Sequence, residues 1–432
     1  MKRQPSPEPA SNLKRAAAAL QKGDLATAER ACRAALKQAP KHPGGLHLLG
    51  VIARSGGYLD DALQLFEKAV AIAPQYGEAW VNLGRVLVDR GEPARAAAAF
   101  EKALATNPKL IPASLGLARV WHNLGKTDAA AELLRKAANM APGSPEQHFQ
   151  LANLLQEIGE YEGAIASYSA CLERQPGHPA ALSNRASAFL KNGQPDAALA
   201  DAEAYSATGR HSANVTAYRV LSLQMLERFA EAEALCDPST MVFELELPFD
   251  DDFAQLLEHD IRAHPTLTTK WDHGLRAARG GAVTADLMSA PTPAIEELVA
   301  QIRWAVQEVS QSLPTSAGHP FLDAVPNEFN VTIWANILAP GGQQAAHIHN
   351  LGWASGVFYS SVPKGIDAAN DEGWIVFGEP GYGLPRPSGA RVRKIQPKAG
   401  RMLLFPSYMW HHTVPLNGSD ERISIAFDII SK

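Results

Sequence analysis

The segment AHIHNLGWASGVFY, residues 346–359, places two histidines, separated by one residue, just before an apolar run. In an extended strand, residues two apart point to the same face. We therefore expect His347 and His349 to face one cavity while Ile348 packs on the other side. The later segment FPSYMWH, residues 405–411, brings a third histidine. Three imidazoles that converge from separate strands can bind one metal ion and leave coordination positions open, so the segment predicts a metal-binding strand and hairpin.

Around this segment, the C-terminal half of the chain alternates between apolar and polar residues. From Phe329 to Ile337 every second residue is apolar, which is typical of a strand with one buried face. Further strands are expected at 355–362, 374–377, 391–395, 401–405 and 422–430. Many short strands separated by Gly/Pro turns indicate a sandwich or barrel, and a jelly roll of the cupin kind fits best. An amphipathic helix from Pro293 to about Leu313 should pack on the outside of the sheets.

The N-terminal half repeats with a period of 34 residues. Three columns carry the period: prolines at Pro40, Pro74, Pro108, Pro142 and Pro176, alanines at Ala28, Ala62, Ala96, Ala130, Ala164 and Ala198, and small residues at Ala16, Gly50, Gly84, Ala118, Ala152 and Ala186. Small residues let two helices approach closely, and proline ends the second helix of a pair. The columns predict one helix pair per period, with Phe66, Phe100 and Tyr168 filling the groove between neighbouring pairs.

This pattern resembles the tetratricopeptide repeat (TPR), whose length and small–small–Pro columns it matches. Six repeats are expected from about residue 9 to 212, with a decayed seventh through Ala232. We predict three parts: a disordered N-terminus (1–8), a TPR array (9–236) and a jelly-roll domain with flanking helices (237–432). The fold class is α + β multidomain, an all-α TPR superhelix followed by a double-stranded β-helix (jelly roll).

A helical array of this kind presents a concave face, which usually binds a peptide or a protein. Six polar residues are candidates for that face: Asn82, Arg85, Arg119, His122, Asn153 and Gln156. The alternative is that each of them is an ordinary solvated helix residue. The array predicts a protein or peptide partner.

Composition excludes several other classes of protein. The net charge is −5 and no run of lysine or arginine is long enough to follow a phosphate backbone, so we expect no nucleic-acid partner. No apolar run approaches the roughly 18–20 residues of a membrane helix, and the N-terminus lacks the apolar core of a signal peptide. Three cysteines, Cys32, Cys171 and Cys236, are too few for a disulfide framework. We predict a cytoplasmic protein without a membrane partner.

Three stretches near the C-terminus carry a second resemblance. HIHNLGWASGVFY, GRMLLFPSYMWHHTVP and ERISIAFD lie in this order between about residues 328 and 430. They resemble the Fe(II)/2-oxoglutarate-dependent oxygenase superfamily, in particular its prolyl-hydroxylase-like branch with His-x-His followed by Ser-Gly-Val-x-Tyr. The resemblance covers roughly a quarter of the chain.

The resemblance implies that Fe(II) binds His347, as the first ligand, and His411, as the distal ligand. His412 is an alternative to His411, although it would face the opposite way on a strand. His349 departs from the family pattern, which has Asp or Glu two residues after the first histidine. It either completes a three-histidine site or leaves its coordination position to water.

The resemblance also implies a seat for 2-oxoglutarate, the co-substrate. Arg422 would hold the far carboxylate, since its planar fork binds carboxylates bidentately. Ser424, two residues further along the same strand face, would donate a second hydrogen bond. Tyr359 and Asn336 are candidates for lining the same cavity.

The activity that this resemblance implies is hydroxylation, with O2 as oxidant, of a protein or peptide presented by the TPR array. Two alternatives stay open. A three-histidine cupin-type metal dioxygenase would not use 2-oxoglutarate, and Arg422 and Ser424 would then bind another carboxylate. The chain could also be a TPR scaffold with a relic barrel and no activity.

Overall fold

The computed structural model describes residues 8–140, 144–270, 277–363, 370–416, 418 and 420–432. The disordered N-terminus expected over 1–8 lies outside this part of the chain, apart from Glu8, which precedes the first helix. The chain divides into two compact units, residues 1–181 and 182–432.

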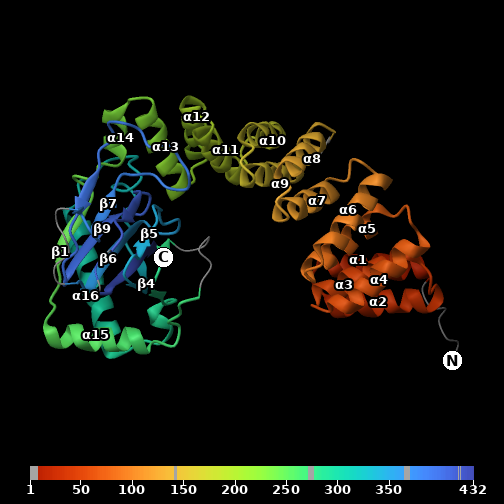
Figure 1. Cartoon of the computed structure of the whole chain (residues 1–432), viewed down its shortest axis with the longest axis horizontal. Helices are drawn as coiled ribbons and strands as arrows, with labels where there is room; N and C mark the ends of the chain where they lie inside the picture. The colour runs from red at the N-terminus through yellow and green to blue at the C-terminus, as the bar shows by residue number, and fades with distance from the viewer. Residues whose placement is uncertain (1–7, 141–143, 271–276, 364–369, 417, 419) are drawn as a thin grey trace. The chain divides into compact units, whose positions relative to one another are not determined.

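The first unit consists of helix pairs (Figure 1). Its helices are α1 (Pro9–Gln21), α2 (Leu25–Gln38), α3 (Pro43–Ser55), α4 (Leu59–Ile72), α5 (Gly77–Asp89), α6 (Pro93–Thr106), α7 (Ile111–Asn123), α8 (Thr127–Met140), α9 (Pro145–Glu157), α10 (Tyr161–Arg174) and the first turn of α11 (Pro179–Lys191). The predicted pair per period is confirmed.

The columns of the repeat are explained by packing within each pair. All six residues of the alanine column are fully buried. In the small column, a Cβ added to Gly50 would come within 2.7 Å of the Phe66 ring, and one added to Gly84 would come equally close to Phe100. In these two pairs a glycine therefore stands where the second helix carries a phenylalanine ring.

Helices α11 to α14 belong to the second unit in their packing. After α11 come α12 (Pro195–Ser206), α13 (Ala213–Met225) and α14 (Phe229–Leu235). Further along the chain are α15 (Asp251–Ala263), the 3-10 helix η1 (Leu287–Ser289) and α16 (Pro293–Ser312). Leu190 on α11 and Leu221 on α13 share one buried core with the strands. The Tyr408 hydroxyl donates to the carbonyl of Leu235 at 2.8 Å, which fastens the end of α14 to the sheet region.

The C-terminal region is rich in antiparallel sheet. Its strands are β1 (Phe243–Glu246), β2 (Ala278–Arg279), β3 (Ala282–Val283), β4 (Phe329–Leu338), β5 (Gln343–Gln344), β6 (Ala354–Ser361), β7 (Ile375–Phe377), β8 (Arg393–Ile395), β9 (Arg401–Pro406), β10 (His411–Thr413) and β11 (Arg422–Ser431). They form a six-stranded sheet in the order β1-β9-β6-β11-β4-β3, a three-stranded sheet β10-β7-β8 and a pair β2-β5.

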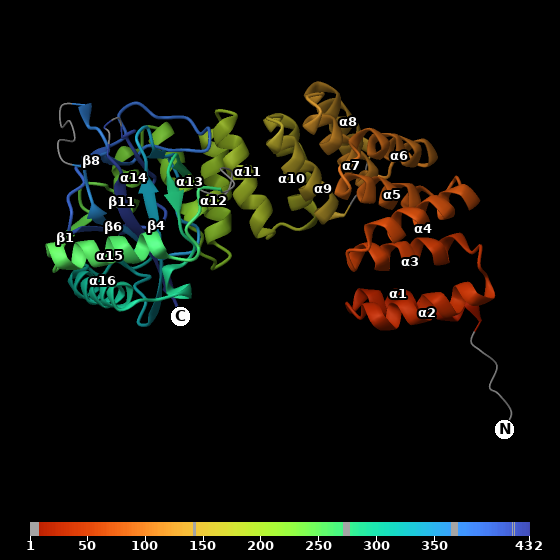
Figure 2. The ribbon, with the colours of Figure 1, turned by 60° about the horizontal axis from the view of Figure 1, so that its bottom comes forward.

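The two helices α15 and α16 cover this region and lie side by side (Figure 2). The apolar side of α16, including Ile295, Ile302 and Val309, is buried in the same core as Phe358 of β6, as the amphipathic pattern predicts. None of the helices in the described residues is long and apolar enough to cross a bilayer.

One expectation about local structure needs correction. The segment around His347 and His349 is extended but is not a strand of a ladder, because only His347 forms a β-bridge, and its partner is His411. The amide of His349 donates instead to the carbonyl of Ser407 at 2.9 Å. Alternate hydrogen bonds to one neighbouring segment still hold both histidine side chains on the same face.

Candidate metal centre

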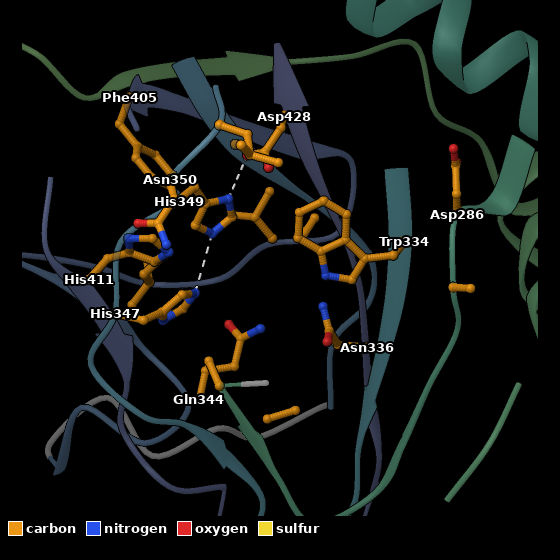
Figure 3. A pocket seen from close by; sticks show the side chains of 18 residues that line it. Asp286, Trp334, Asn336, Gln344, His347, His349, Asn350, Phe405, His411 and Asp428 are labelled. Carbon is orange, nitrogen blue, oxygen red and sulfur yellow. Dashed lines mark hydrogen bonds and ion pairs between the residues drawn. The ribbon is translucent and has the colours of Figure 1, made fainter. Parts of the chain in front are cut away.

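Three histidines, two from the segment before β6 and one from β10, gather at one end of a cavity (Figure 3). The ring centroids of His347 and His411 are 4.2 Å apart, and that of His349 lies 5.1 Å from each. One ring nitrogen from each residue lies within 4.8 Å of the others. The bridge between His347 and His411 fixes two of these rings, because their backbone amides and carbonyls bond each other at 3.0 and 3.1 Å.

The hydrogen bonds of the rings define which nitrogens can bind a metal. Nδ1 of His347 faces the carbonyl of Ala345 at 2.8 Å, and Nδ1 of His411 faces that of Met409 at 3.0 Å. Carbonyl oxygens only accept, so both Nδ1 atoms carry the proton and both Nε2 atoms keep a lone pair.

The third ring is held by a carboxylate. Nδ1 of His349 donates to Oδ1 of Asp428 at 2.5 Å, and its Nε2 lies 3.2 Å from Nε2 of His347. Either a proton shared between the two nitrogens or a metal ion bound by both accounts for this distance. Nitrogens bound at about 2.1 Å in neighbouring octahedral positions are about 3 Å apart, so the spacing fits ligation of one ion.

Burial keeps two of these imidazoles neutral. Loss of solvent around the ring, reinforced by neighbouring His349, lowers the pKa of His347 to about 3. Burial, with His347 and His349 nearby, holds the pKa of His411 well below its ordinary value of 6.5. A neutral imidazole is the form that binds metal, so the cluster is ready for a cation at neutral pH.

Asp428 is the residue of this centre that sequence reasoning missed. Its Oδ1 also accepts from the Ser355 hydroxyl at 2.6 Å, and Ser355 bonds Ser407 at 2.7 Å. The signal was present, because Asp428 lies an even number of residues after Arg422 and Ser424 and therefore shares their strand face. The carboxylate of Asp428 therefore reaches the cluster through its hydrogen bond with His349, and it does not occupy position 349, where the family pattern has Asp or Glu.

The cavity itself has a volume of about 680 Å³. Trp334 and Asn336 of β4 line it across from the histidines, and Phe405 and Ala426 also contribute to its wall (Figure 3). The other predicted co-substrate residues, Arg422, Ser424 and Tyr359, lie on the same strand faces but are not part of the cavity wall.

Arg422 is a buried cation without a carboxylate partner in the described part of the chain. Its side chain is 1 % exposed, and no carboxylate among the described residues pairs with it. It donates to the carbonyl of Gly373 and lies 5.9 Å from the Tyr359 ring, but its Nε has no partner in the described part of the chain. Burial lowers its pKa. Nδ2 of Asn336, paired across the ladder with Ser424, is likewise a buried donor without an acceptor there.

His412, the alternative distal ligand, points away from the cluster. Its Nε2 lies 3.1 Å from Oε2 of Glu379, whereas His411 faces His347 and His349. The alternation along β10 accounts for the difference.

Most of the polar residues predicted for the concave face of the array have internal partners. Asn82 bonds the ring of His47 at 2.7 Å. The Tyr168 hydroxyl bonds Asn153 at 2.7 Å and Gln156 at 3.0 Å. His122 approaches Thr127 at 3.2 Å. The two arginines of the set, Arg85 and Arg119, instead line a small cavity together with Arg54, which the sequence reasoning did not single out.

The fold and the centre define the class of protein: a helical repeat array followed by a sheet-rich region with a three-histidine cluster. Residues 13–77, 81–145 and 149–213 match the family model "Tetratricopeptide repeat". Residues 332–428, which contain the three histidines, match the family model "Putative 2OG-Fe(II) oxygenase". The chain therefore carries a TPR array over residues 13–213 and a domain of this oxygenase family over residues 332–428.

Solved structures of TPR proteins are similar to part of the chain. TTC0263, a thermophilic TPR protein from Thermus thermophilus, is 25% identical with a TM-score of 0.37, over 42% of this chain and 99% of its own. PilW, a type IV pilus biogenesis factor, is 23% identical with a TM-score of 0.41, over 48% and 96%. YrrB, a TPR protein with an unusual peptide-binding site, is 19% identical with a TM-score of 0.32, over 47% and 96%. None of the curated proteins matches the chain.

Proposed function

We propose that the chain is an Fe(II)/2-oxoglutarate-dependent dioxygenase that hydroxylates a protein or peptide bound by its TPR array. One observation carries the proposal: all three Nδ1 atoms of the cluster are bonded to oxygen acceptors while the Nε2 atoms are left to face one point. The donor set fits a divalent ion of the first transition row, and the match to the oxygenase family favours Fe(II).

When bound, Fe(II) supplies the oxidising chemistry, in which O2 converts 2-oxoglutarate to succinate and CO2 and hydroxylates a substrate C–H bond. The residues of the chain hold and orient the reactants. His347, His349 and His411 provide the nitrogen ligands. Trp334 and Phe405 provide apolar walls that exclude water from the same cavity.

Arg422 supports the 2-oxoglutarate assignment. A buried charge without a partner is expensive, and a carboxylate beside its Nε would compensate it. Asn336 offers a second buried donor that needs an acceptor, and Ser424 lies opposite Asn336 in the ladder. A dicarboxylate that spans from the histidines to Arg422 would satisfy these groups together.

We infer further that the sheets form a double-stranded β-helix. The six-stranded sheet carries Trp334, Asn336 and Asp428 on its cavity face, and the smaller sheet carries His411 across from them. The bridge between His347 and His411 lies beside the smaller sheet. Two antiparallel sheets that enclose one cavity are the arrangement expected of a jelly roll.

Succinate release tests the proposal. The purified chain, supplied with Fe(II), 2-oxoglutarate and O2, should release succinate, and His411→Ala should abolish the release. His412→Ala is the matched control, because its side chain contacts Glu379 outside the cluster. Equal succinate release from the His411→Ala and wild-type chains would refute the proposal.

His349 favours one second candidate, a three-histidine dioxygenase that does not use 2-oxoglutarate. In that case O2 consumption would depend on Fe(II) and on His411 but would not be accompanied by succinate. A chain that binds no metal and consumes no O2 would instead be a TPR scaffold with a relic barrel.

A further inference from the structure

A small cavity on the array lies between the first helices of three consecutive pairs. It has a volume of about 360 Å³, and its wall includes Arg54 of α3, Arg85 and Val88 of α5, and Arg119 and Val120 of α7. We call it the arginine groove. The volume is near the lower end of the range of about 300–1,000 Å³ that is typical of ligand pockets, which suits a short stretch of peptide.

A glycine opens the floor of the arginine groove. Gly116 occupies the repeat position held by Asn82 one period earlier, and a Cβ at Gly116 would come within 2.4 Å of the Phe100 ring. The absence of a side chain there leaves Phe100 and Val120, which are 1% and 4% exposed, as an apolar floor, and Val88 is 43% exposed at its edge. An aliphatic side chain of a partner can therefore lie on this floor and cover Val88.

The charge of the arginine groove is positive. Arg54 pairs with Asp89, which also lines the groove, at 2.7 Å, and Arg119 lies 3.7 Å from Glu157. Arg85 has no carboxylate within ion-pair distance in the described residues, and its NH1 atom reaches only Oδ1 of Asn82, at 3.4 Å.

Arg85 and Arg119 are one period apart and therefore occupy the same position in successive repeats. Burial and the neighbouring Arg54 lower the pKa of Arg85, although Asp89 nearby acts in the opposite direction, as is expected where cations outnumber anions.

We propose that the arginine groove binds an acidic peptide segment, with a carboxylate between Arg85 and Arg119 and an aliphatic side chain on the Phe100 floor. Guanidinium groups bind carboxylates through charge-assisted hydrogen bonds, and the apolar floor selects against a bare anion. The inference rests on the proposed function only in taking this segment to belong to the protein that is hydroxylated. The groove itself binds the segment whether or not the metal centre is active.

A random-peptide display library, selected on the full-length chain, is the probe for this inference. Selected peptides should be enriched in aspartate or glutamate next to leucine, isoleucine or valine. A fluorescein-labelled peptide from the selection should bind less tightly as salt is added. It should also bind about tenfold or more weakly to Arg85→Gln and to Arg119→Gln, since a charge-assisted hydrogen bond contributes about 1.5–3 kcal/mol.

Arg135→Gln is the matched control. Arg135 is also an exposed arginine of the array, but it pairs with Glu132 and Glu160 on α8 and beside α10, so its replacement should leave peptide binding unchanged. Circular dichroism checks that all three variants keep their helices. Selection of neutral or basic peptides, no enrichment at all, or equal binding by Arg85→Gln and wild type would each overturn the inference.

The outcome is independent of the metal centre. Peptide binding without succinate release would refute the proposed function and leave the arginine groove intact. Succinate release without acidic-peptide binding would overturn the inference about the arginine groove and leave the metal centre's activity intact.

Discussion

Asp428 gives a physical reason for an imidazole at position 349. A carboxylate that accepts a hydrogen bond from Nδ1 makes Nε2 a better metal ligand and fixes the ring. The Ser355 and Ser407 hydroxyls in turn hold the carboxylate. Asp428 thus supplies the negative charge that a directly bound Asp or Glu would bring, but the ring of His349 lies between that charge and the metal position.

Replacing Asp428 with asparagine should therefore weaken metal binding. We expect Asp428→Asn to lower the affinity for Co(II), used as a spectroscopic probe, by about 10- to 100-fold. Visible absorbance during a titration of the apo chain measures the affinity. Asp286→Asn is the control, because Asp286 lines the same cavity and forms no hydrogen bond to His347, His349 or His411. An unchanged Co(II) affinity in Asp428→Asn would show that the hydrogen bond from His349 to Asp428 does not strengthen metal binding.

Arg422 yields a prediction about stability as well as binding. Because its buried charge has no ion-pair partner in the described residues, Arg422→Gln should raise the free energy of unfolding of the apo chain by about 1 kcal/mol or more. Thermal unfolding measures the change.

With a redox-inert divalent metal already bound to both chains, adding 2-oxoglutarate should further raise the melting temperature of wild type but not of Arg422→Gln. A melting temperature that falls in apo Arg422→Gln would show that its charge is satisfied without the co-substrate.

For single residues, strand alternation predicted that His347 and His349 face the same side, and the resemblance to the oxygenase family implied that His411 joins them. Sequence reasoning could not find the Asp428–His349 contact, since the register between β11 and the segment before β6 depends on tertiary packing. The sequence predicted that Arg422 and Asn336 lie near the site. It could not predict that each has a buried nitrogen without a partner in the described residues, because this too depends on tertiary packing.

The helix pairs of the array depend on glycine where an aromatic ring packs. The Phe100 ring lies against both Gly84 and Gly116, so it cannot withdraw from an added methyl group. Gly84→Ala should lower the free energy of unfolding by about 1–3 kcal/mol through overpacking. Gly177→Ala is the control, because nothing lies within 4 Å of a Cβ added there. Equal urea midpoints for the two variants would contradict this reading of the column.

His148 should make the array sensitive to acid. Neither of its ring nitrogens has a partner among the described residues, and burial, with Arg174 nearby, lowers its pKa below the ordinary value of 6.5. The unfolded chain therefore binds a proton at a higher pH than the folded one does, so stability is full above about pH 6.5 and declines as the pH falls further.

Replacement of His148 tests this effect. His148→Leu should flatten the decline in melting temperature between about pH 7 and pH 5, whereas replacing the exposed His211 with glutamine should leave it unchanged. A pH profile identical to wild type in His148→Leu would assign the acid sensitivity to other groups.

At the scale of elements, the sequence predicted one helix pair per 34-residue period because each period repeats the same packing. It also predicted β4, β6, β9 and β11, which have long alternating or apolar runs. It predicted a strand at 346–350 where the chain is extended with a single bridge, since alternation alone cannot distinguish a ladder from isolated hydrogen bonds.

For the whole chain, the sequence and the packing mark different boundaries. The period continues to about Ala232, whereas the second compact unit begins at Leu182. Helices that still follow the repeat in sequence share a core with the strands, through residues such as Leu190 of α11 and Leu221 of α13. The periodicity of the sequence predicts the fold of each helix pair. It does not predict which neighbouring element covers the apolar surface of that pair.

A truncation tests this difference. A chain that begins at Pro179, the start of α11, should unfold cooperatively, because it retains the helices that complete the core. A chain that begins at Asp237 should unfold at a much lower temperature or aggregate, since it exposes the apolar residues that α13 and α14 cover. Equal melting temperatures for the two truncations would contradict the shared core.

The most direct test of the central claim is anaerobic titration of the apo chain with Fe(II), followed by 2-oxoglutarate, while visible absorbance is recorded. We predict saturation at one equivalent of Fe(II) and a new absorbance band when 2-oxoglutarate is added, with the band lost in His411→Ala and retained in His412→Ala. No Fe(II) binding, or Fe(II) binding with no spectral response to 2-oxoglutarate, would contradict an iron centre that uses this co-substrate.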